Sequence, residues 1–433
     1  MDTTLVITLS TALVFVLLAW GVHIGVALGL AGVIGTVLTT GRLEAGVNTT
    51  FLVSASVTSE YGFIVIPMFI LMGQLAAATG IAGDLFKAAY RWAGRFPGGL
   101  AIATIVTCAG MAAITGSSVA VASAMTRIAL PEMRKYDYAD TLSVGAITVG
   151  GTLAIMIPPS VTFVLYSIFA EQSIGKLLIS GILPGLLTAA LYIVSIVIRT
   201  LLWPSLAPKG PTFSWWDKLG SLTWVLPFVG IILTIIAGLL FGIWTPVEAS
   251  AAGVVTVMVL GLIRGTVTPK VILEAGVETA ITSASVMVVV IGAIIFSKFL
   301  ALSGFNKALA EYVIGLHLSP DVLFSLLVLI YVILGMFLEA TSILALTVPL
   351  FLPVVVAVGW SPIWFGVILV SLMEIAAVTP PVGLNLYAVK AGAPDISIET
   401  ISLASLPFWL CNVVAIYVIY RWPDIALWLP GLM

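Results

Sequence analysis

The chain has 433 residues, and its 17 basic and 19 acidic side chains make up 8% of it, whereas a typical soluble domain has roughly 25% charged residues. Hydrophobic residues account for 61%, more than a water-facing surface tolerates, which excludes a soluble globular domain. A net charge of -2 with no basic run gives no support for nucleic-acid binding. The composition therefore predicts an all-α polytopic membrane protein in contact with the lipid bilayer.

The predicted helices follow from apolar segments long enough to cross a bilayer. In chain order they lie at about 5–20, 21–40, 51–79, 141–170, 174–198, 222–241, 246–263, 271–300, 362–389 and 397–420. Two further stretches, about 98–133 and 320–353, are divided by small polar residues and are predicted as re-entrant hairpins. Pro–Pro pairs interrupt about 141–172 and 362–390, which are predicted as broken helices.

Basic residues orient these segments, because Lys and Arg gather in cytoplasmic loops. Three loops carry them: Lys87, Arg91 and Arg95; Arg127, Arg134 and Lys135; Arg199, Lys209 and Lys218. With these loops in the cytoplasm, the N-terminus is predicted to be periplasmic. The first half then makes an odd number of crossings, so the second half starts on the opposite side.

An internal repeat divides the chain. Leu43–Val47 recurs letter for letter as Leu273–Val277, and the Pro pairs at 158–159 and 380–381 lie 222 positions apart. The collinear matches predict a first repeat at 1–200, a cytoplasmic linker at 201–221 and a second repeat at 222–433. Because the crossing number is odd, the repeats are predicted to be inverted. This architecture is typical of secondary transporters with a site near the midplane.

Four helix breaks, two in each half, are the candidate functional motifs: Thr115–Ser118, Ile157–Ser160, Ala340–Ser342 and Thr379–Asn385. Breaks persist at membrane depth where they line a cavity or ligand. Carbonyls freed by proline, with Ser, Thr and Asn oxygens, suit Na⁺, while helix N-termini favour an anion. Tight helix packing by small residues is the alternative explanation for any single break.

Three acidic residues, Glu248, Glu339 and Glu374, lie inside apolar runs. A structural role, accepting hydrogen bonds from free amides, and a role in ion or proton binding both stay open for them. The glycine-rich stretches contain no P-loop pattern, and no metalloprotease or serine-hydrolase motif occurs. We therefore expect no nucleotide cofactor and no enzyme activity.

In combination, several motifs resemble the large membrane subunit (M, DctM-like) of tripartite ATP-independent periplasmic (TRAP) transporters: Gly116–Ala120, Leu130–Met133, Ile157–Ser160, Gly181–Gly185, Thr245–Ala249 and Thr379–Gly383. The resemblance implies a multi-pass protein of the bacterial inner membrane that imports small organic anions with the Na⁺ gradient. It also implies an elevator mechanism, in which a transport domain of hairpins and broken helices moves against a scaffold.

The resemblance further implies two partners, a small four-helix membrane subunit, expected as a separate chain, and a periplasmic substrate-binding protein. Na⁺ ligands are expected at Gly116, Ser117, Ser118, Gly335, Ser342, Thr379, Pro380, Val382 and Gly383. Pro158, Pro159, Ser160 and Asn385 are expected at the substrate. The alternative is a stand-alone Na⁺/dicarboxylate elevator symporter that needs no binding protein. A passive channel is a further alternative, and it predicts transport independent of Na⁺.

Overall fold

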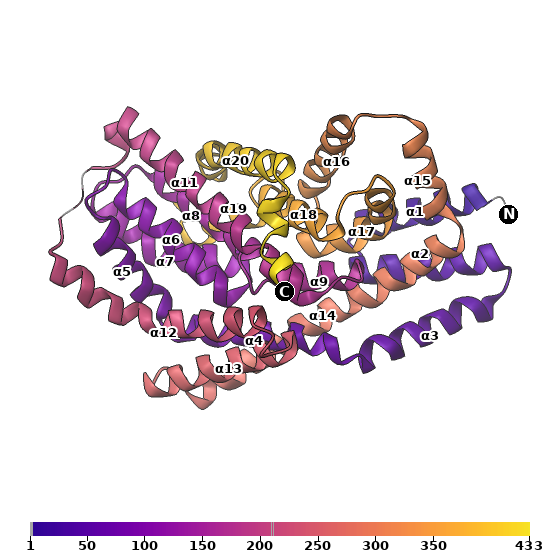
Figure 1. The fold of residues 1–433 in the computed structure, drawn as a ribbon, viewed down its shortest axis with the longest axis horizontal. Helices are drawn as coiled ribbons and strands as arrows, with labels where there is room; N and C mark the ends of the chain where they lie inside the picture. Colours follow the sequence, from indigo (N-terminus) through magenta and orange to yellow (C-terminus); the bar gives the residue numbers. More distant parts are fainter. Residues whose placement is uncertain (1–2, 209, 211) are drawn as a thin grey trace.

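The computed structural model describes residues 3–208, 210 and 212–433, without the side chain of residue 228. Lys209, one of the basic residues assigned to the cytoplasm, lies outside this set. The described residues form helices and connections throughout, so the predicted all-α fold is confirmed. Figure 1 shows an elongated molecule, with the N-terminus at one end of its long axis and the C-terminus near the middle.

The helices of the first half are α1 (Thr3–Ala19), α2 (Ile24–Thr40), α3 (Leu43–Ser59), η1 (Tyr61–Ile64), α4 (Val65–Ala78), α5 (Ile81–Ala93), α6 (Gly99–Thr115), α7 (Ser118–Lys135), α8 (Asp140–Met156), α9 (Val161–Phe169), α10 (Ile174–Ser180), α11 (Ile182–Leu202) and η2 (Pro204–Leu206). The second half consists of α12 (Trp215–Leu240), α13 (Pro246–Ile263), α14 (Pro269–Leu302), α15 (Phe305–Gly315), α16 (Pro320–Gly335), α17 (Ala340–Ala357), α18 (Pro362–Ala377), α19 (Leu384–Gly392), α20 (Ile398–Arg421), α21 (Asp424–Leu427) and η3 (Pro430–Leu432).

Six described helices are long and apolar enough to cross a membrane, or eight if each of two bent pairs counts as one span. The single segment predicted at 51–79 is wrong, because the chain breaks at Glu60 between α3 and η1. The hydroxyls of Thr58 and Ser59 turn back to bond carbonyls of their own helix, and Glu60 is extended. Its repeat counterpart, α14, runs unbroken over 34 residues.

The central connection is shorter than the segment 201–221 predicted as linker. Helix α12 already begins at Trp215, because Ser214 and Asp217 form a capping box. The Ser214 hydroxyl accepts from the Asp217 amide at 3.1 Å, and the Asp217 carboxylate accepts from the Ser214 amide at 3.2 Å. The Ser214 hydroxyl, which donates to the Asp217 carboxylate at 2.7 Å, and the Ser214 amide hold the pKa of Asp217 below its usual value.

Each half contains a hairpin followed by a broken helix. In the first half α6 and α7 meet at Gly116, whose φ of 59° is left-handed, and α8 bends by 43° into α9. In the second half α16 and α17 form the hairpin, and α18 and α19 flank the break at 378–383. The breaks of the first hairpin and of both broken helices thus fall where glycine, proline and hydroxyl residues predict them. The break of the second hairpin lies at 336–339, before the predicted Ala340–Ser342, which instead form the first turn of α17.

A crossing of α2 and α14 lies beside these elements (Figure 1) and depends on glycine. A Cβ at Gly292 of α14 would lie 1.9 Å from the Gly25 carbonyl oxygen of α2, and one at Gly32 would lie 2.8 Å from the Phe296 backbone. Such close backbone approach is possible where side chains are absent. A smaller apolar cluster joins this crossing to α1 and α17.

We expect Gly292→Ala to separate α2 from α14, because the added methyl group would overlap the Gly25 carbonyl. Overpacking of this kind costs about 1–3 kcal/mol, seen as a lower melting temperature of the detergent-purified protein. Gly276→Ala on the same helix is the matched control, since its Cβ would meet nothing within 4 Å. Equal melting temperatures for the two variants would contradict the crossing.

Candidate functional site

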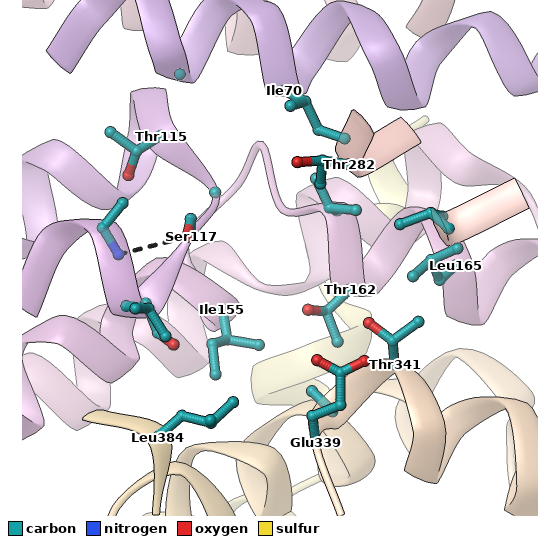
Figure 2. A pocket seen from close by; sticks show the side chains of 18 of the residues that line it. Ile70, Thr115, Ser117, Ile155, Thr162, Leu165, Thr282, Glu339, Thr341 and Leu384 are labelled. Carbon is teal, nitrogen blue, oxygen red and sulfur yellow. Dashed lines mark hydrogen bonds between the residues drawn. The ribbon is translucent and has the colours of Figure 1, made fainter. Parts of the chain in front are cut away.

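The tips of both hairpins and the break between α8 and α9 face one cavity of about 320 Å³. Figure 2 shows hydroxyls and one carboxylate directed into it: Thr115 and Ser117 from the first hairpin, Thr162 from α9, and Glu339 and Thr341 from the second hairpin. Helices α4 and α14 close the other side with Ile70, Gln74, Thr282 and Val286. The cavity is therefore formed by both halves of the chain.

The first hairpin tip is fixed by two close backbone approaches. A Cβ at Gly116 would lie 3.1 Å from the Pro159 carbonyl oxygen, so the tip rests on the first broken helix. A Cβ at Gly73 of α4 would lie 2.7 Å from the Thr115 carbonyl oxygen on the other side. The Ser117 hydroxyl accepts from the Ala120 amide at 3.4 Å and caps α7. The tip is thus held between α4 and the Pro158–Pro159 break.

The second hairpin meets the second broken helix in an equivalent way. The Val382 amide donates to the Met336 carbonyl at 3.2 Å, joining the break at 378–383 to the hairpin tip. Between them lies a void of about 40 Å³, and Ser118 of the first hairpin also reaches it. Four predicted Na⁺ ligands line this void: Ser118, Gly335, Val382 and Gly383.

Asn385 at the start of α19 carries an acceptor oxygen without a donor. Its side chain is fully buried, and its amide Nδ2 donates to the Thr148 carbonyl at 3.1 Å. Its Oδ1 is buried and has no hydrogen-bond partner. A Cβ at Gly151 would lie 2.9 Å from the Ser118 carbonyl oxygen and 3.1 Å from Asn385 Nδ2, so these groups converge. A buried oxygen of this kind requires a donor or a cation.

The partial charges at the breaks come from the helix termini that meet there. Helices α7 and α17 begin at the two hairpin tips, and α9 begins at the first break, so positive helix ends point toward the cavity. Helices α6, α8, α16 and α18 end at the same breaks and present carbonyls, which suit a cation. Among the described cavity-lining residues, Glu339 is the charged one.

Several predicted site residues point elsewhere in this structure. The Thr379 hydroxyl donates to the Ile375 carbonyl at 2.6 Å and accepts from the Trp409 indole at 3.2 Å. The Ser160 hydroxyl donates to the Ile155 carbonyl of its own break. The remaining residues lie beside the cavity without lining it: Ser342 is buried, Pro158 and Pro159 support the tip, and Pro380 faces a separate surface groove with Pro381 and Tyr387.

Sequence reasoning missed Thr162 and Thr282, which line the cavity, and it included Thr341 in a candidate motif without naming it as a ligand. For Thr341 a signal was present, because it lies 224 positions after Ser117, as Ser342 lies after Ser118. Thr282 carries no comparable signal, since its place beside the cavity depends on how α14 packs against the hairpins.

The three acidic residues have different surroundings. Glu248 forms a capping box at the start of α13, where its carboxylate accepts from the Thr245 amide at 2.8 Å, so its role is structural. Glu339 stands at the N-cap of α17 and faces the cavity. Glu374 is completely buried in α18 with neither carboxyl oxygen hydrogen bonded.

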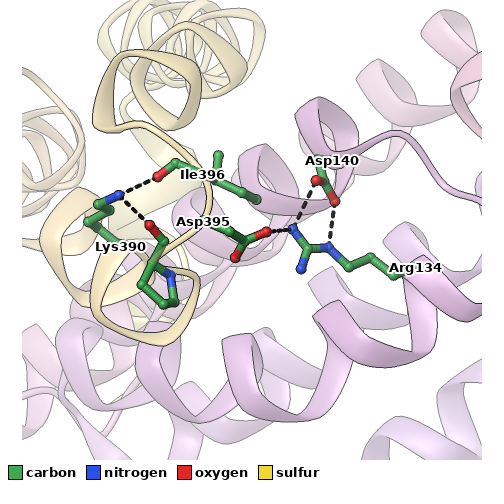
Figure 3. Close-up of polar contacts among 6 residues, drawn as sticks. Arg134, Asp140, Lys390, Asp395 and Ile396 are labelled. Carbon is green, nitrogen blue, oxygen red and sulfur yellow. Dashed lines mark hydrogen bonds and ion pairs between the residues drawn. The ribbon is translucent and has the colours of Figure 1, made fainter.

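A second polar cluster joins the two halves outside the cavity (Figure 3). Arg134 at the end of α7 binds both oxygens of Asp140, at 2.8 and 2.9 Å, and donates to Asp395 at 2.5 Å. Lys390 fixes the same α19–α20 connection through the carbonyls of Pro394 and Ile396, at 2.8 and 2.7 Å. Hydrogen bonding from Arg134 holds the pKa of Asp395 below its usual value.

The fold and cavity define an all-α membrane protein with paired hairpins and broken helices around a shared site. Residues 11–425 match the family described as tripartite ATP-independent periplasmic transporter, DctM component. The chain is 31% identical to the C4-dicarboxylate TRAP transporter large permease protein DctM of Vibrio cholerae, with 98% of each chain covered. It is also 31% identical to the isethionate TRAP transporter permease protein DctMQ of Oleidesulfovibrio alaskensis, covering 95% of this chain and 64% of that one.

Among solved structures, the fold is similar to that of the Alcanivorax borkumensis YdaH transporter, with a TM-score of 0.54, 17% identity and coverage of 86% of this chain and 85% of that one. This likeness concerns the fold alone. The chain belongs to the DctM component family of tripartite ATP-independent periplasmic transporters. It is a multi-pass large permease, as its motifs indicated.

We expect Arg134→Gln to loosen the contact between the first hairpin and the α19–α20 connection, because it removes the guanidinium shared by Asp140 and Asp395. Thermal unfolding of the purified variant should show a lower melting temperature at neutral pH. Since the pKa of Asp395 is depressed by folding, this stabilisation is present above the unfolded value of about 3.9 and is lost as the pH falls below it. The difference between the two proteins should therefore shrink in acid.

Arg127→Gln is the control for this prediction, because Arg127 is an exposed residue of the same helix. A melting temperature that falls equally in both variants would indicate a general effect of charge and would contradict the role of the cluster.

Proposed function

We propose that this permease imports small organic anions with the Na⁺ gradient as driving force, by an elevator movement, after receiving the solute from a periplasmic binding protein. The observation that carries the proposal is the meeting of both hairpin tips and both helix breaks around two neighbouring cavities that share lining residues. Membership of the DctM family supports the class of transporter.

The cavity suits a small anion with hydroxyl or carboxyl groups. The N-termini of α7, α9 and α17 offer free amides and positive helix ends, while Thr115, Ser117, Thr162 and Thr341 offer hydroxyls. A volume of about 320 Å³ lies at the small end of ligand sites. The relatives described above are named for a C4-dicarboxylate and for isethionate, which are small anions of this kind.

Charge balance in the cavity supports a coupled cation. An anionic substrate beside Glu339 would place two negative groups in a site whose described lining contains no Lys, Arg or His. Bound Na⁺ offsets this repulsion, so anion binding and Na⁺ binding become mutually dependent. The unpartnered oxygen of Asn385 and the carbonyl of Ser118 are oxygen ligands close to the small void.

For the Na⁺ sites we retain Gly116, Ser117, Ser118, Gly335, Ser342, Thr379, Pro380, Val382 and Gly383, and for substrate contacts Pro158, Pro159, Ser160 and Asn385. Among these residues, the ones that line the cavities have the better structural support as ligands. Glu339 and Thr341 also line the large cavity, and we add them as candidate ligands. In the present arrangement the hydroxyls of Thr379 and Ser160 would have to turn to reach an ion.

The transport unit would comprise the hairpins α6/α7 and α16/α17 with the broken helices α8/α9 and α18/α19. Contacts within this unit, such as Gly116 on Pro159 and Arg134 with Asp395, join elements of both halves. The crossing of α2 and α14, together with α4 and α13, would form the scaffold that faces the cavity from outside. A small four-helix membrane subunit would bind the scaffold, and the N-terminus would lie in the periplasm of a bacterial inner-membrane protein.

We expect Ser118→Ala to raise the Na⁺ concentration for half-maximal uptake about tenfold, the effect of losing one ligand worth about 1.4 kcal/mol. Ser118 is chosen because it lines both the large cavity and the small void. Substrate uptake would be measured in proteoliposomes against increasing external Na⁺. Ser59→Ala, at an exposed helix end, should match the wild type. An unchanged Na⁺ dependence in Ser118→Ala would contradict this site.

The need for partners is tested separately by reconstitution. With the complete set of subunits, uptake should require an Na⁺ gradient and cease when choline replaces Na⁺. Uptake by the large permease alone, without binding protein or small subunit, would instead favour the stand-alone symporter. Uptake that continues equally in choline would contradict Na⁺ coupling and favour a passive pathway.

A further inference from the structure

Glu374 forms a second polar site, separate from the transport cavity. Its carboxyl group lies in α18, one turn before the break at 378–383, and the side chain is fully buried. The α18 residues that line the small void are Met373, Ala376 and Ala377, on other sides of the helix. Neither carboxyl oxygen of Glu374 has a hydrogen-bond partner. A role as a cap for the broken helix therefore does not explain this residue.

Helix α18 packs against α8 and α20, which carry Thr152 and Asn412, and both of these side chains lie against the hydroxyl of Tyr192 of α11. The Tyr192 hydroxyl donates to Asn412 Oδ1 of α20 at 2.6 Å and lies 3.4 Å from the Thr152 hydroxyl of α8. The ring of Phe408 packs edge-on against Tyr192 with centroids 5.8 Å apart. Asn412 Nδ2 is also buried without a partner.

None of the described cations pairs with Glu374. The titratable groups on the elements around α18 interact elsewhere. Asp140 binds Arg134, and the Tyr166 hydroxyl donates to the Pro362 carbonyl. The Cys411 thiol faces Leu191 and Pro407, and the Tyr331 ring packs at a tilt against Phe351. Asp321 accepts from Tyr420, Lys390 binds carbonyls, and Lys176, Glu339, Glu399, Tyr417, Arg421 and Asp424 are exposed.

An ionised carboxylate in this environment would be unpaired at membrane depth, which costs several kcal/mol. A protonated carboxyl group has no such cost. It offers one hydrogen-bond donor and one acceptor, and polar groups without a partner lie nearby. Neither oxygen is hydrogen bonded to Tyr192 or Asn412 in this arrangement, but a protonated carboxyl group could donate to the phenol oxygen and accept from Asn412 Nδ2 after a small movement. The proton needs no cavity, whereas Na⁺ would need a shell of oxygen ligands.

We propose that Glu374, with Tyr192 and Asn412, is a proton-binding site, and that its proton is exchanged with solvent during the transport cycle. On loading, a proton from water forms the O–H bond of the Glu374 carboxyl group. On release the same bond breaks, and the proton returns to water on the side then accessible. Because Glu374 is fully buried in this arrangement, the exchange requires the contact between α18 and α20 to loosen. This inference rests on the proposed function only for the exchange step.

The first experiment uses the complete transporter in proteoliposomes that contain a trapped pH-sensitive dye. Under an Na⁺ gradient we expect substrate addition to drive proton movement into the lumen in step with uptake. Glu374→Gln keeps the shape of the side chain but removes its titratable proton. The variant should therefore retain Na⁺-driven uptake and lose the proton movement. Glu44→Gln, at an exposed position of α3, is the matched control and should retain both. Failure of the Na⁺ gradient to drive uptake in the wild type would contradict the proposed function, and uptake without proton movement would contradict the proton site alone.

A second measurement does not depend on transport or on a folded variant. Infrared difference spectra of the wild-type protein in detergent, with and without Na⁺, report the stretching band of a protonated carboxyl group. We expect such a band, with a change on Na⁺ addition, and its loss in Glu374→Gln where that variant folds. A carboxylate spectrum with no protonated band in the wild type would overturn the proposal. So would a Glu374→Gln variant that alters the Na⁺ dependence of uptake but leaves proton movement intact, because Glu374 would then be an Na⁺ ligand.

Discussion

The structure depends on one constraint, that broken helices at membrane depth must find partners for their free backbone groups. The four breaks meet this requirement by meeting each other. Gly116 places the first hairpin tip on the Pro159 carbonyl, and the Val382 amide donates to Met336 of the second tip. Once the breaks converge, their helix ends enclose a polar cavity, and the scaffold helices must come close enough to seal it. Gly73 lets α4 approach the first hairpin tip at the Thr115 carbonyl, while the glycines at 25, 32 and 292 bring the backbones of α2 and α14 into contact with each other.

The repeat gives both halves the same arrangement of hairpin and broken helix, but the two halves carry different residues at two equivalent positions. Thr115 and Thr152 of the first half correspond to Glu339 and Glu374 of the second, at offsets of 224 and 222. In the first half both threonine hydroxyls are satisfied by carbonyls of their own helices, those of Met111 and Val149. In the second half one carboxyl group faces the cavity and the other is buried without a partner. The duplication therefore accounts for the geometry of the site, and later divergence accounts for its acidity, which lies on the second half alone.

The sequence was sufficient to predict the hairpins and the broken helices, because the signals for a break are local: a glycine, a Pro–Pro pair and adjacent hydroxyls. It was insufficient wherever a side chain had a choice of partners. Thr379 and Ser160 have the right chemistry for a ligand, yet nearby carbonyls and the Trp409 indole take their hydrogen bonds. Thr282 reaches the cavity through the packing of α14, which no local pattern encodes. The break at Glu60 was missed because the apolar residues at both ends of 51–79 outweighed the polar run at its middle, where the hydroxyl groups of Thr58 and Ser59 bond back to their own helix.

Charge also limits what the moving part of such a protein can carry. Buried charge is costly at every depth of the bilayer, so a transport unit that holds Glu339, an anionic substrate and Glu374 would cross with three negative groups unless each is compensated. In the proposed mechanism, Na⁺ at the hairpin tips would compensate the groups that face the cavity, because oxygen atoms converge there. It does not reach Glu374, which lies on another side of α18 among a phenol and an amide. A proton is the cation that fits the buried carboxyl group of Glu374. When the cavity and Glu374 are both neutralised, the transport unit moves at the lowest cost in electrostatic free energy.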